Sequence, residues 1–195
     1  MKRTIDILVS GLGLLILSPL MLLLGLAIKL NSRGPALFRQ QRIGRKFEPF
    51  WIYKFRTMVE GAPARGAAIT AGADPRITRV GRVLRKTKLD ELPQLWNVLK
   101  GDMSLVGPRP EVPKYVEMFR DDYERILSVR PGITDPASVQ FRDESEVLGR
   151  SSDPEQTYVR EILPQKLALS HEYIERASLA YDLQLIARTL LRILR

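Results

Sequence analysis

The sequence predicts an α+β protein, and three observations lead to this prediction. The segment from Ile7 to Ile28 carries no charged residue and is long enough for a membrane helix. Two short runs rich in aromatic and branched residues follow, separated by a turn, which is typical of a small antiparallel β element. Apolar residues in the rest of the chain fall mainly at helical spacing. We therefore expect a membrane helix at residues 1–33 and a cytoplasmic, membrane-associated domain at residues 34–195, with several amphipathic helices at the membrane interface.

The composition limits the classes of function. The chain has 195 residues and a net charge of +9, which suits nucleic acid, an anionic membrane surface or a phosphorylated substrate as partner. It contains no cysteine, so disulfides and thiolate metal sites are excluded. Because His171 is its one histidine, a His-based triad or a multi-His zinc site is also excluded within one chain. Hard-metal chemistry on carboxylates remains open.

The apolar segment allows two arrangements in a membrane. Its roughly 22 uncharged residues can cross a bilayer as one straight helix. Ser18 and Pro19 lie near its middle, where proline removes a hydrogen bond and favours a kink, and Ser18 can bind a carbonyl that the kink frees. Basic residues flank both ends, and the positive-inside rule places such flanks on the cytoplasmic side. From the residues alone, a full span and a re-entrant helix-break-helix are equally open.

The two runs at residues 36–43 and 50–57 predict a hairpin with its turn at 44–46. Lys54 and Arg56 on the second strand either reach phosphates or are solvated edge-strand cations. Residues 61–73 are rich in Ala and Gly, and they predict either a mobile loop that closes over a substrate or an inert connection.

Asp90 and Glu91 occupy the most informative position in the sequence. Thr78 can cap one helix, and a second helix begins near Pro93 and stops at Lys100-Gly101, so the two acids lie at the junction, at the start of the second helix. A helix N-terminus favours phosphate. Basic residues surround the pair in sequence: Arg82, Arg85, Lys86, Lys88 and Arg109. Carboxylates in this setting can hold a divalent cation, attack phosphorus or take a proton, although acids there also simply complement the helix dipole.

The remaining chain predicts a short strand at 102–106 and then a Pro-Arg-Pro turn that fixes Arg109, whose planar guanidinium suits a phosphate or a uracil edge. An amphipathic helix is expected at 111–127 and a turn at 130–134. Two further helices are expected at 155–170, with a bend at Pro164, and at 171–195. The last is basic and amphipathic, and it either lies on the membrane surface or packs on the core.

Several segments together resemble the bacterial sugar transferases, the monotopic phosphoglycosyl transferases. Residues 89–110 read Leu-Asp-Glu-Leu-Pro-Gln-Leu-Trp-Asn-Val-Leu-Lys-Gly-Asp-Met-Ser-Leu-Val-Gly-Pro-Arg-Pro, which is similar to the signature of that family. Ser18-Pro19, Tyr-Lys-Phe-Arg-Thr-Met at 53–58 and Val-Arg-Pro-Gly-Ile-Thr at 129–134 match in order, so the resemblance covers nearly the whole chain. Residues 135–140 depart from the Gly-Trp-Ala-Gln form of other members, and sugar specificity is therefore not carried over.

The resemblance implies a monotopic enzyme on the cytoplasmic face of the bacterial inner membrane, held by a re-entrant helix broken at Ser18-Pro19. It implies transfer of a sugar-1-phosphate from a UDP-sugar to undecaprenyl (polyprenyl) phosphate, with release of UMP and a covalent aspartyl intermediate, as the first membrane step of glycoconjugate or polysaccharide synthesis. Mg²⁺ is the implied cofactor. The partners are the two substrates and the inner leaflet, with no nucleic acid and with a homodimer left open.

The resemblance also assigns roles to individual residues. Asp90 is the expected nucleophile and Mg²⁺ ligand, and Glu91 either accepts a proton or positions the lipid phosphate. The expected substrate-binding residues are Arg85, Arg109, Arg56, Lys54 and Asp182.

Two alternatives remain at this point: a membrane-anchored basic module that binds nucleic acid or anionic lipid, and a scaffold within an envelope assembly. Strongly salt-dependent binding of nucleic acid would favour the former. Metal-dependent release of a nucleoside monophosphate would exclude both.

Overall fold

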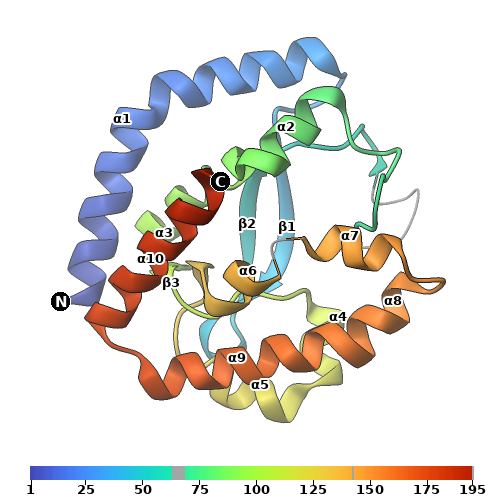
Figure 1. The fold of residues 1–195 in the computed structure, drawn as a ribbon. Helices are drawn as coiled ribbons and strands as arrows, with labels where there is room; N and C mark the ends of the chain where they lie inside the picture. The colour runs from blue at the N-terminus through green and yellow to red at the C-terminus, as the bar shows by residue number, and fades with distance from the viewer. Residues whose placement is uncertain (63–68, 142, 195) are drawn as a thin grey trace.

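A computed structural model describes residues 1–62, 69–141 and 143–194 of the chain. Figure 1 shows a long bent helix, α1, framing one side of a domain in which helices surround a central hairpin. The predicted α+β class is confirmed, since the described residues form helices together with an antiparallel and a parallel pair of strands.

Helix α1 (Lys2–Asn31) contains Pro19 and remains helical through it. It changes direction near its middle (Figure 1). The Ser18 hydroxyl donates a hydrogen bond of 2.8 Å to the carbonyl of Leu15, which is the acceptor that the missing N–H of Pro19 would otherwise bind. The expected bend is therefore present, but the expected interruption of the helix is not, because Ser18 supplies the missing donor.

Helix α1 packs one face on the domain and leaves the other open. In its first half, Gly13 lets it approach α3 so closely that an added Cβ would lie 3.3 Å from Leu95. In its second half, Met21, Leu24 and Ile28 pack with Phe55 and Leu84. The opposite face exposes large apolar side chains: Ile7, Leu8, Val9, Leu12, Leu15, Ile16, Leu20, Leu22, Leu23, Leu26 and Leu30. By length and composition, α1 can cross a membrane.

The predicted hairpin is confirmed. Strand β1 (Leu37–Ile43) pairs antiparallel with β2 (Pro49–Phe55), and a short 3₁₀ turn η1 (Arg45–Phe47) connects them. Along β2, Phe50 and Ile52 are buried while Trp51 between them is exposed, as alternation in a half-buried strand requires.

The helix junction around the acidic pair also forms as predicted. Thr78 is the N-cap of helix α2 (Arg79–Thr87), and its hydroxyl accepts a hydrogen bond of 2.9 Å from the N–H of Gly81. A 3₁₀ turn η3 (Leu89–Glu91) leads to α3 (Gln94–Lys100), with Pro93 as the residue before its first turn. Gly101 ends α3 with a φ of 102°, a conformation that glycine adopts readily.

A second, parallel pair of strands lies next to this junction. Strand β3 (Ser104–Val106) fulfils the prediction for 102–106, and it pairs with β4 (Gly132–Thr134). The prediction of a plain turn at 130–134 was therefore wrong for its second half. The pairing is non-local, and the sequence of either strand alone does not reveal it.

The helical prediction for 111–127 was also partly wrong. The segment forms α4 (Pro113–Met118) and α5 (Arg120–Ile126), which are divided at Phe119, where the backbone has φ −126° and ψ 42°. The division lets buried residues of both helices reach one core, which also includes residues of the C-terminal helices: Tyr115, Val116, Tyr123, Ile126, Leu127, Leu148, Tyr158, Ile162, Leu163 and Leu167.

The C-terminal part contains more helices than predicted. Short helices α6 (Pro136–Gln140), α7 (Glu144–Gly149) and α8 (Pro154–Thr157) precede a π-helical turn η4 (Tyr158–Ile162). Helix α9 (Leu163–Arg176) has Pro164 in its first turn, where no N–H is required, and α10 (Leu179–Leu194) follows. The boundary between the last two helices thus lies at 177–178 instead of 171.

The loop predicted at 61–73 is described only in part, because residues 63–68 lie outside the described residues. Ala62 is buried, Ile69 and Ala71 pack against the large core cluster, and the N–H of Gly72 donates to the carbonyl of Ser145 at 2.5 Å. The described ends of the loop are therefore held by the domain.

Candidate active site

Asp90 and Glu91 lie in the turn η3, between α2 and α3, and the structure brings three other segments against them. Lys54 comes from β2, Arg85 from α2 and Arg109 from the turn after β3. Asp90 is only 8% exposed. The site is therefore a buried Asp90 and a partly buried Glu91 among cations from separate elements.

Glu91 is held by a double ion pair. Its Oε1 lies 2.9 Å from Lys54 Nζ and 2.5 Å from Arg109 Nη2. Burial alone would raise the pKa of Glu91, but Arg109 and Lys54 outweigh it and hold that pKa well below its usual range. The same pairing raises the pKa of Arg109. Glu91 is thus an ionised carboxylate that fixes two cations, and a carboxylate with a low pKa is a weak base.

Asp90 has the opposite character. Burial raises its pKa, and the neighbouring charge of Glu91 adds to this effect, while Lys54, Lys88 and Arg85 act against it. Its Oδ1 is buried without a hydrogen-bond partner among the described residues. A carboxylate oxygen that is unpartnered, buried and close to cations is available to bind or attack an electrophile.

The positive charge of Arg85 interacts with the carboxylate of Asp90. Its Nε donates to the Thr57 hydroxyl at 2.9 Å, which fixes the guanidinium against the end of β2. Burial lowers the pKa of Arg85, and Asp90 opposes this change. Arg85, Lys54 and Arg109 are therefore the predicted substrate-binding residues that the structure gathers around the acidic pair.

Arg56 and Asp182 have different surroundings. Arg56 Nη2 donates to the carbonyl and hydroxyl of Ser32 at 2.8 and 2.9 Å, at the end of α1. Asp182 accepts from Lys2 Nζ at 2.6 Å and from the Tyr173 hydroxyl at 2.7 Å. Among the described contacts, neither residue binds Asp90 or Glu91. Both connect α1 to the domain.

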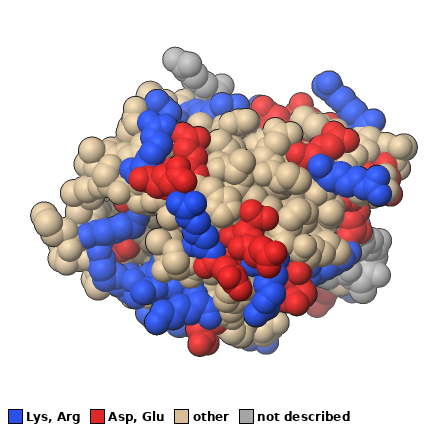
Figure 2. All heavy atoms as spheres, turned by 90° about the horizontal axis from the view of Figure 1, so that it is seen from below, with Lys and Arg blue, Asp and Glu red and all other residues tan. Residues whose placement is uncertain are grey.

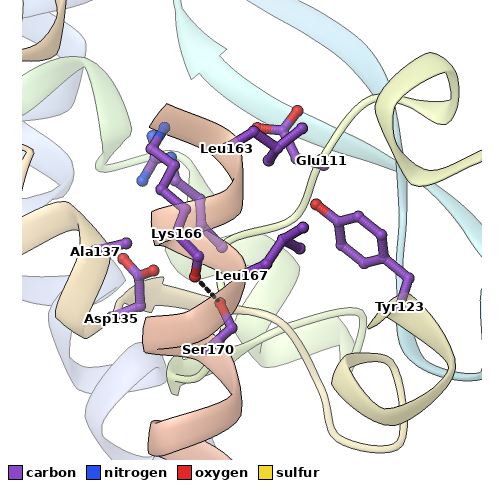
Figure 3. Close-up of a pocket in the computed structure, with 9 residues that line it drawn as sticks. Glu111, Tyr123, Asp135, Ala137, Leu163, Lys166, Leu167 and Ser170 are labelled. Atoms are coloured by element: carbon purple, nitrogen blue, oxygen red, sulfur yellow. Dashed lines mark hydrogen bonds between the residues drawn. The ribbon is translucent and has the colours of Figure 1, made fainter. Parts of the chain in front are cut away.

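A small pocket lies beside Arg109, on the side of α6 and α9. It encloses about 20 Å³, enough for one water molecule, and Figure 3 shows the carboxylate of Asp135 facing α9 across it. Glu111 in its wall accepts from the Tyr158 hydroxyl at 2.7 Å and pairs with Arg42 at 3.2 Å. Neither Asp135 nor Glu111 was predicted from the sequence as a site residue; the unusual 135–140 segment was the signal near Asp135.

The described residues contain no group of three or more His, Asp or Glu side chains that could hold a metal ion. The site still fits Mg²⁺. Mg²⁺ is commonly bound through one or two carboxylates together with substrate phosphates, and the unpartnered Oδ1 of Asp90 is a donor of this kind.

The net charge of +9 does not produce a uniformly basic surface on the face near α5 and α9. Figure 2 shows acidic and basic side chains interspersed there, around an uncharged area.

The bent apolar helix and the Asp-Glu pair among three cations define the class: a protein with a helix able to enter a membrane and a strongly charged site beside it. The chain belongs to the bacterial sugar transferase family, whose profile matches residues 1–195.

Individual relatives are similar along almost the entire chain. A UDP-N-acetylgalactosamine-undecaprenyl-phosphate N-acetylgalactosaminephosphotransferase of Aeromonas hydrophila is 41% identical over 99% of this chain and 43% of its own length. A UDP-glucose:undecaprenyl-phosphate glucose-1-phosphate transferase of Caulobacter vibrioides is 41% identical over 96% of this chain and 67% of its own. One of the same description from Escherichia coli is 36% identical over 98% and 40%. The chain thus spans less than half of two of these relatives.

Proposed function

We propose that this protein transfers a sugar-1-phosphate from a UDP-sugar to undecaprenyl or another polyprenyl phosphate, giving a polyprenyl-diphosphate sugar and UMP. The unpartnered, buried carboxylate oxygen of Asp90 among Lys54, Arg85 and Lys88 is the observation that carries this proposal. The names of the relatives, which specify UDP-sugars and undecaprenyl phosphate, support the choice of substrates. Such a reaction would begin the assembly of a glycoconjugate or polysaccharide on the membrane.

The proposed reaction proceeds in two displacements at the phosphorus that bears the sugar, both involving Asp90. In the first, an oxygen of Asp90 attacks the sugar-bearing phosphorus, the bond from that phosphorus to the bridging oxygen breaks, and UMP leaves with the electron pair. In the second, an oxygen of the lipid phosphate attacks the same phosphorus and the acyl-phosphate bond to Asp90 breaks, which restores the carboxylate. Burial favours this nucleophile, because a carboxylate with a raised pKa is more nucleophilic once ionised.

Glu91 acts in this scheme by positioning cations. Its double ion pair holds Lys54 and Arg109 beside Asp90, where both can bind phosphate oxygens and stabilise the charge that develops during transfer. The low pKa disfavours the expected proton transfer by Glu91. Its ion pairs favour the other expected role, positioning of the lipid phosphate, exerted through Lys54 and Arg109.

Mg²⁺ would be held by Asp90 together with the phosphates of the donor. When bound, it would neutralise charge on the leaving group.

The packing of α1 supports a re-entrant helix on the cytoplasmic face. Its first half is bound to the domain through Lys2 and Asp182, and its second half through the packing of Ile28 on Phe55. A helix whose two halves both contact one domain and whose middle is bent returns to the side from which it entered. The exposed apolar face would then lie in the inner leaflet.

The reaction is tested by measuring UMP release from purified protein with Mg²⁺, undecaprenyl phosphate and a panel of UDP-sugars, beside the D90N variant. We expect release with at least one donor and none with D90N. The raised pKa of Asp90 means that its ionisation destabilises the folded protein when the pH rises above that pKa. D90N removes this cost and should unfold at an equal or higher temperature than the wild type. Its inactivity would therefore not reflect misfolding. Equal release by D90N would exclude Asp90 as the nucleophile.

The membrane arrangement is tested with single cysteines, since the chain has none of its own. Thr4→Cys and Ser152→Cys each introduce a thiol at an exposed position, on α1 and on the domain respectively. We expect a membrane-impermeant maleimide to label both from the cytoplasmic side of oriented vesicles. Labelling of the two from opposite sides would show a full span instead.

A further inference from the structure

Arg109 has a second acidic neighbour besides Glu91. Its Nη2 binds Glu91 Oε1, while its Nη1 lies 3.5 Å from Glu91 Oε2 and 3.4 Å from the hydroxyl of Ser138. That hydroxyl in turn donates to the Oδ1 of Asp135, which also accepts from the N–H of Ser138 at 2.8 Å. Asp135 therefore reaches Arg109 through one side chain.

Asp135 is unusual among the acids that line the small pocket beside Arg109. It is only 1% exposed, and its Oδ2 has no hydrogen-bond partner among the described residues. The other acid of the pocket, Glu111, has Arg42 as an ion-pair partner, and the pocket's Lys166 is paired with Glu144. A buried carboxylate needs a compensating charge, and for Asp135 the structure provides Arg109, which Glu91 and Asp135 share.

Arg109 is thereby held by two groups. Glu91 binds both of its terminal nitrogens, and the hydroxyl of Ser138, which binds Asp135, lies 3.4 Å from Nη1. Its side chain is still 31% exposed, so it remains accessible to a ligand. A guanidinium held by two groups keeps one orientation, and a planar fork binds a phosphate or a nucleotide edge only in the correct orientation.

We propose that Asp135, through Ser138, is a positioning residue that orients Arg109 for binding the nucleotide of the donor. This inference rests on the proposed function, because it takes the donor to be a uridine nucleotide. Asp135 touches no reacting atom in this scheme.

Two variants separate the parts of this device. D135N keeps an N-cap acceptor for the N–H of Ser138 but removes the charge, and S138A keeps Asp135 but removes the connecting hydroxyl. S138T restores a hydroxyl. D153N is the matched control, because Asp153 also caps a helix before a proline and accepts from Gln156 N at 3.0 Å, at an exposed position.

The experiment measures UMP affinity by calorimetry for each purified variant. We expect D135N and S138A to weaken UMP binding about 3–10-fold, and S138T and D153N to leave it within about two-fold. The kcat/KM for the donor should fall by at least the same factor, since Arg109 both binds the donor and stabilises the charge that develops during transfer.

Coupling to Arg109 distinguishes positioning from a merely structural role. In an R109K background, which keeps a charge but loses the fork, D135N should cause no further loss of UMP affinity. Equal losses in both backgrounds, or equal affinity of D135N and wild type, would overturn the role of Asp135 while leaving the proposed reaction intact. Failure of the wild type itself to bind UMP would overturn the nucleotide site and this inference together.

Discussion

Two adjacent carboxylates acquire opposite properties at the centre of this molecule. Glu91 has two cations within 2.9 Å, whereas Asp90 has an oxygen with no partner among the described residues. Their pKa values consequently move apart, upward for Asp90 mainly through burial and well downward for Glu91 because Arg109 and Lys54 overcome burial. Separation of this kind assigns different chemical tasks to neighbouring acids.

The raised pKa of Asp90 predicts the pH dependence of the first displacement. Only ionised Asp90 attacks, so below its pKa the rate should fall about tenfold per pH unit. Arg85 is among the cations that hold this pKa down, so R85Q should raise it and move the acid limb of the profile to higher pH.

The profile is measured as UMP release in a single turnover without lipid acceptor. Arg79→Gln provides the control, because Arg79 is an exposed cation at the start of the same helix and its loss should leave the limb in place. An acid limb that R85Q does not move would separate Arg85 from the ionisation of Asp90.

At the scale of elements, helix α2 is positioned by one glycine. A Cβ on Gly81 would lie 2.0 Å from the carbonyl oxygen of Thr57, so the helix contacts the segment just after β2 with its bare backbone. The same residue, Thr57, binds Arg85 through its side chain. The glycine and the arginine of α2 thus fix the helix against one residue.

We therefore expect G81A to displace α2 and Arg85 together. Overpacking of this severity should lower the free energy of unfolding by about 1–3 kcal/mol or more, and UMP release should fall with it. Thermal unfolding and activity are measured side by side, with V83A, a change at an exposed position of α2, as the control. Wild-type stability in G81A would show that α2 can shift without cost.

Elements specified by neighbouring residues could be predicted from the sequence, and elements specified by distant contacts could not. The Thr78 cap, the hairpin and the turn with Asp90 and Glu91 follow from local patterns, and all three are present. The pairing of β3 with β4 and the division of a helix at Phe119 depend on tertiary packing. The site shows the same limit: the acids were found by motif, but the partnership of Lys54 with Glu91 joins segments 37 residues apart.

At the scale of the whole molecule, α1 is attached to the domain by polar contacts near both ends. Lys2 binds Asp182, and the carboxylate of Asp6 accepts from Ser104 and from the N–H of Leu105 at 3.1 and 3.0 Å. Near the other end, Arg56 binds Ser32. These contacts hold the bent helix as part of the domain instead of as a separate anchor.

D182N tests whether Asp182 serves attachment or substrate binding. Attachment predicts a loss of about 1–3 kcal/mol in stability, because Lys2 and Tyr173 lose a charged acceptor, with an unchanged KM for the donor. The readouts are the unfolding temperature and the KM. D122N, which removes the partly exposed acid that pairs with His171, is the control. A raised KM at unchanged stability would instead place Asp182 in the substrate site.

The contact between Lys2 and Asp182 joins residues separated by 180 positions. During translation, α1 therefore emerges from the ribosome long before Asp182, which binds the start of that helix, is synthesised. The final attachment cannot guide the helix as it enters the bilayer; the basic residues at both flanks and the bend supported by Ser18 must do so. Asp182 then stabilises an orientation that was already set during translation. A substitution at Asp182 should therefore lower the stability of the folded protein without reversing the direction in which α1 inserts.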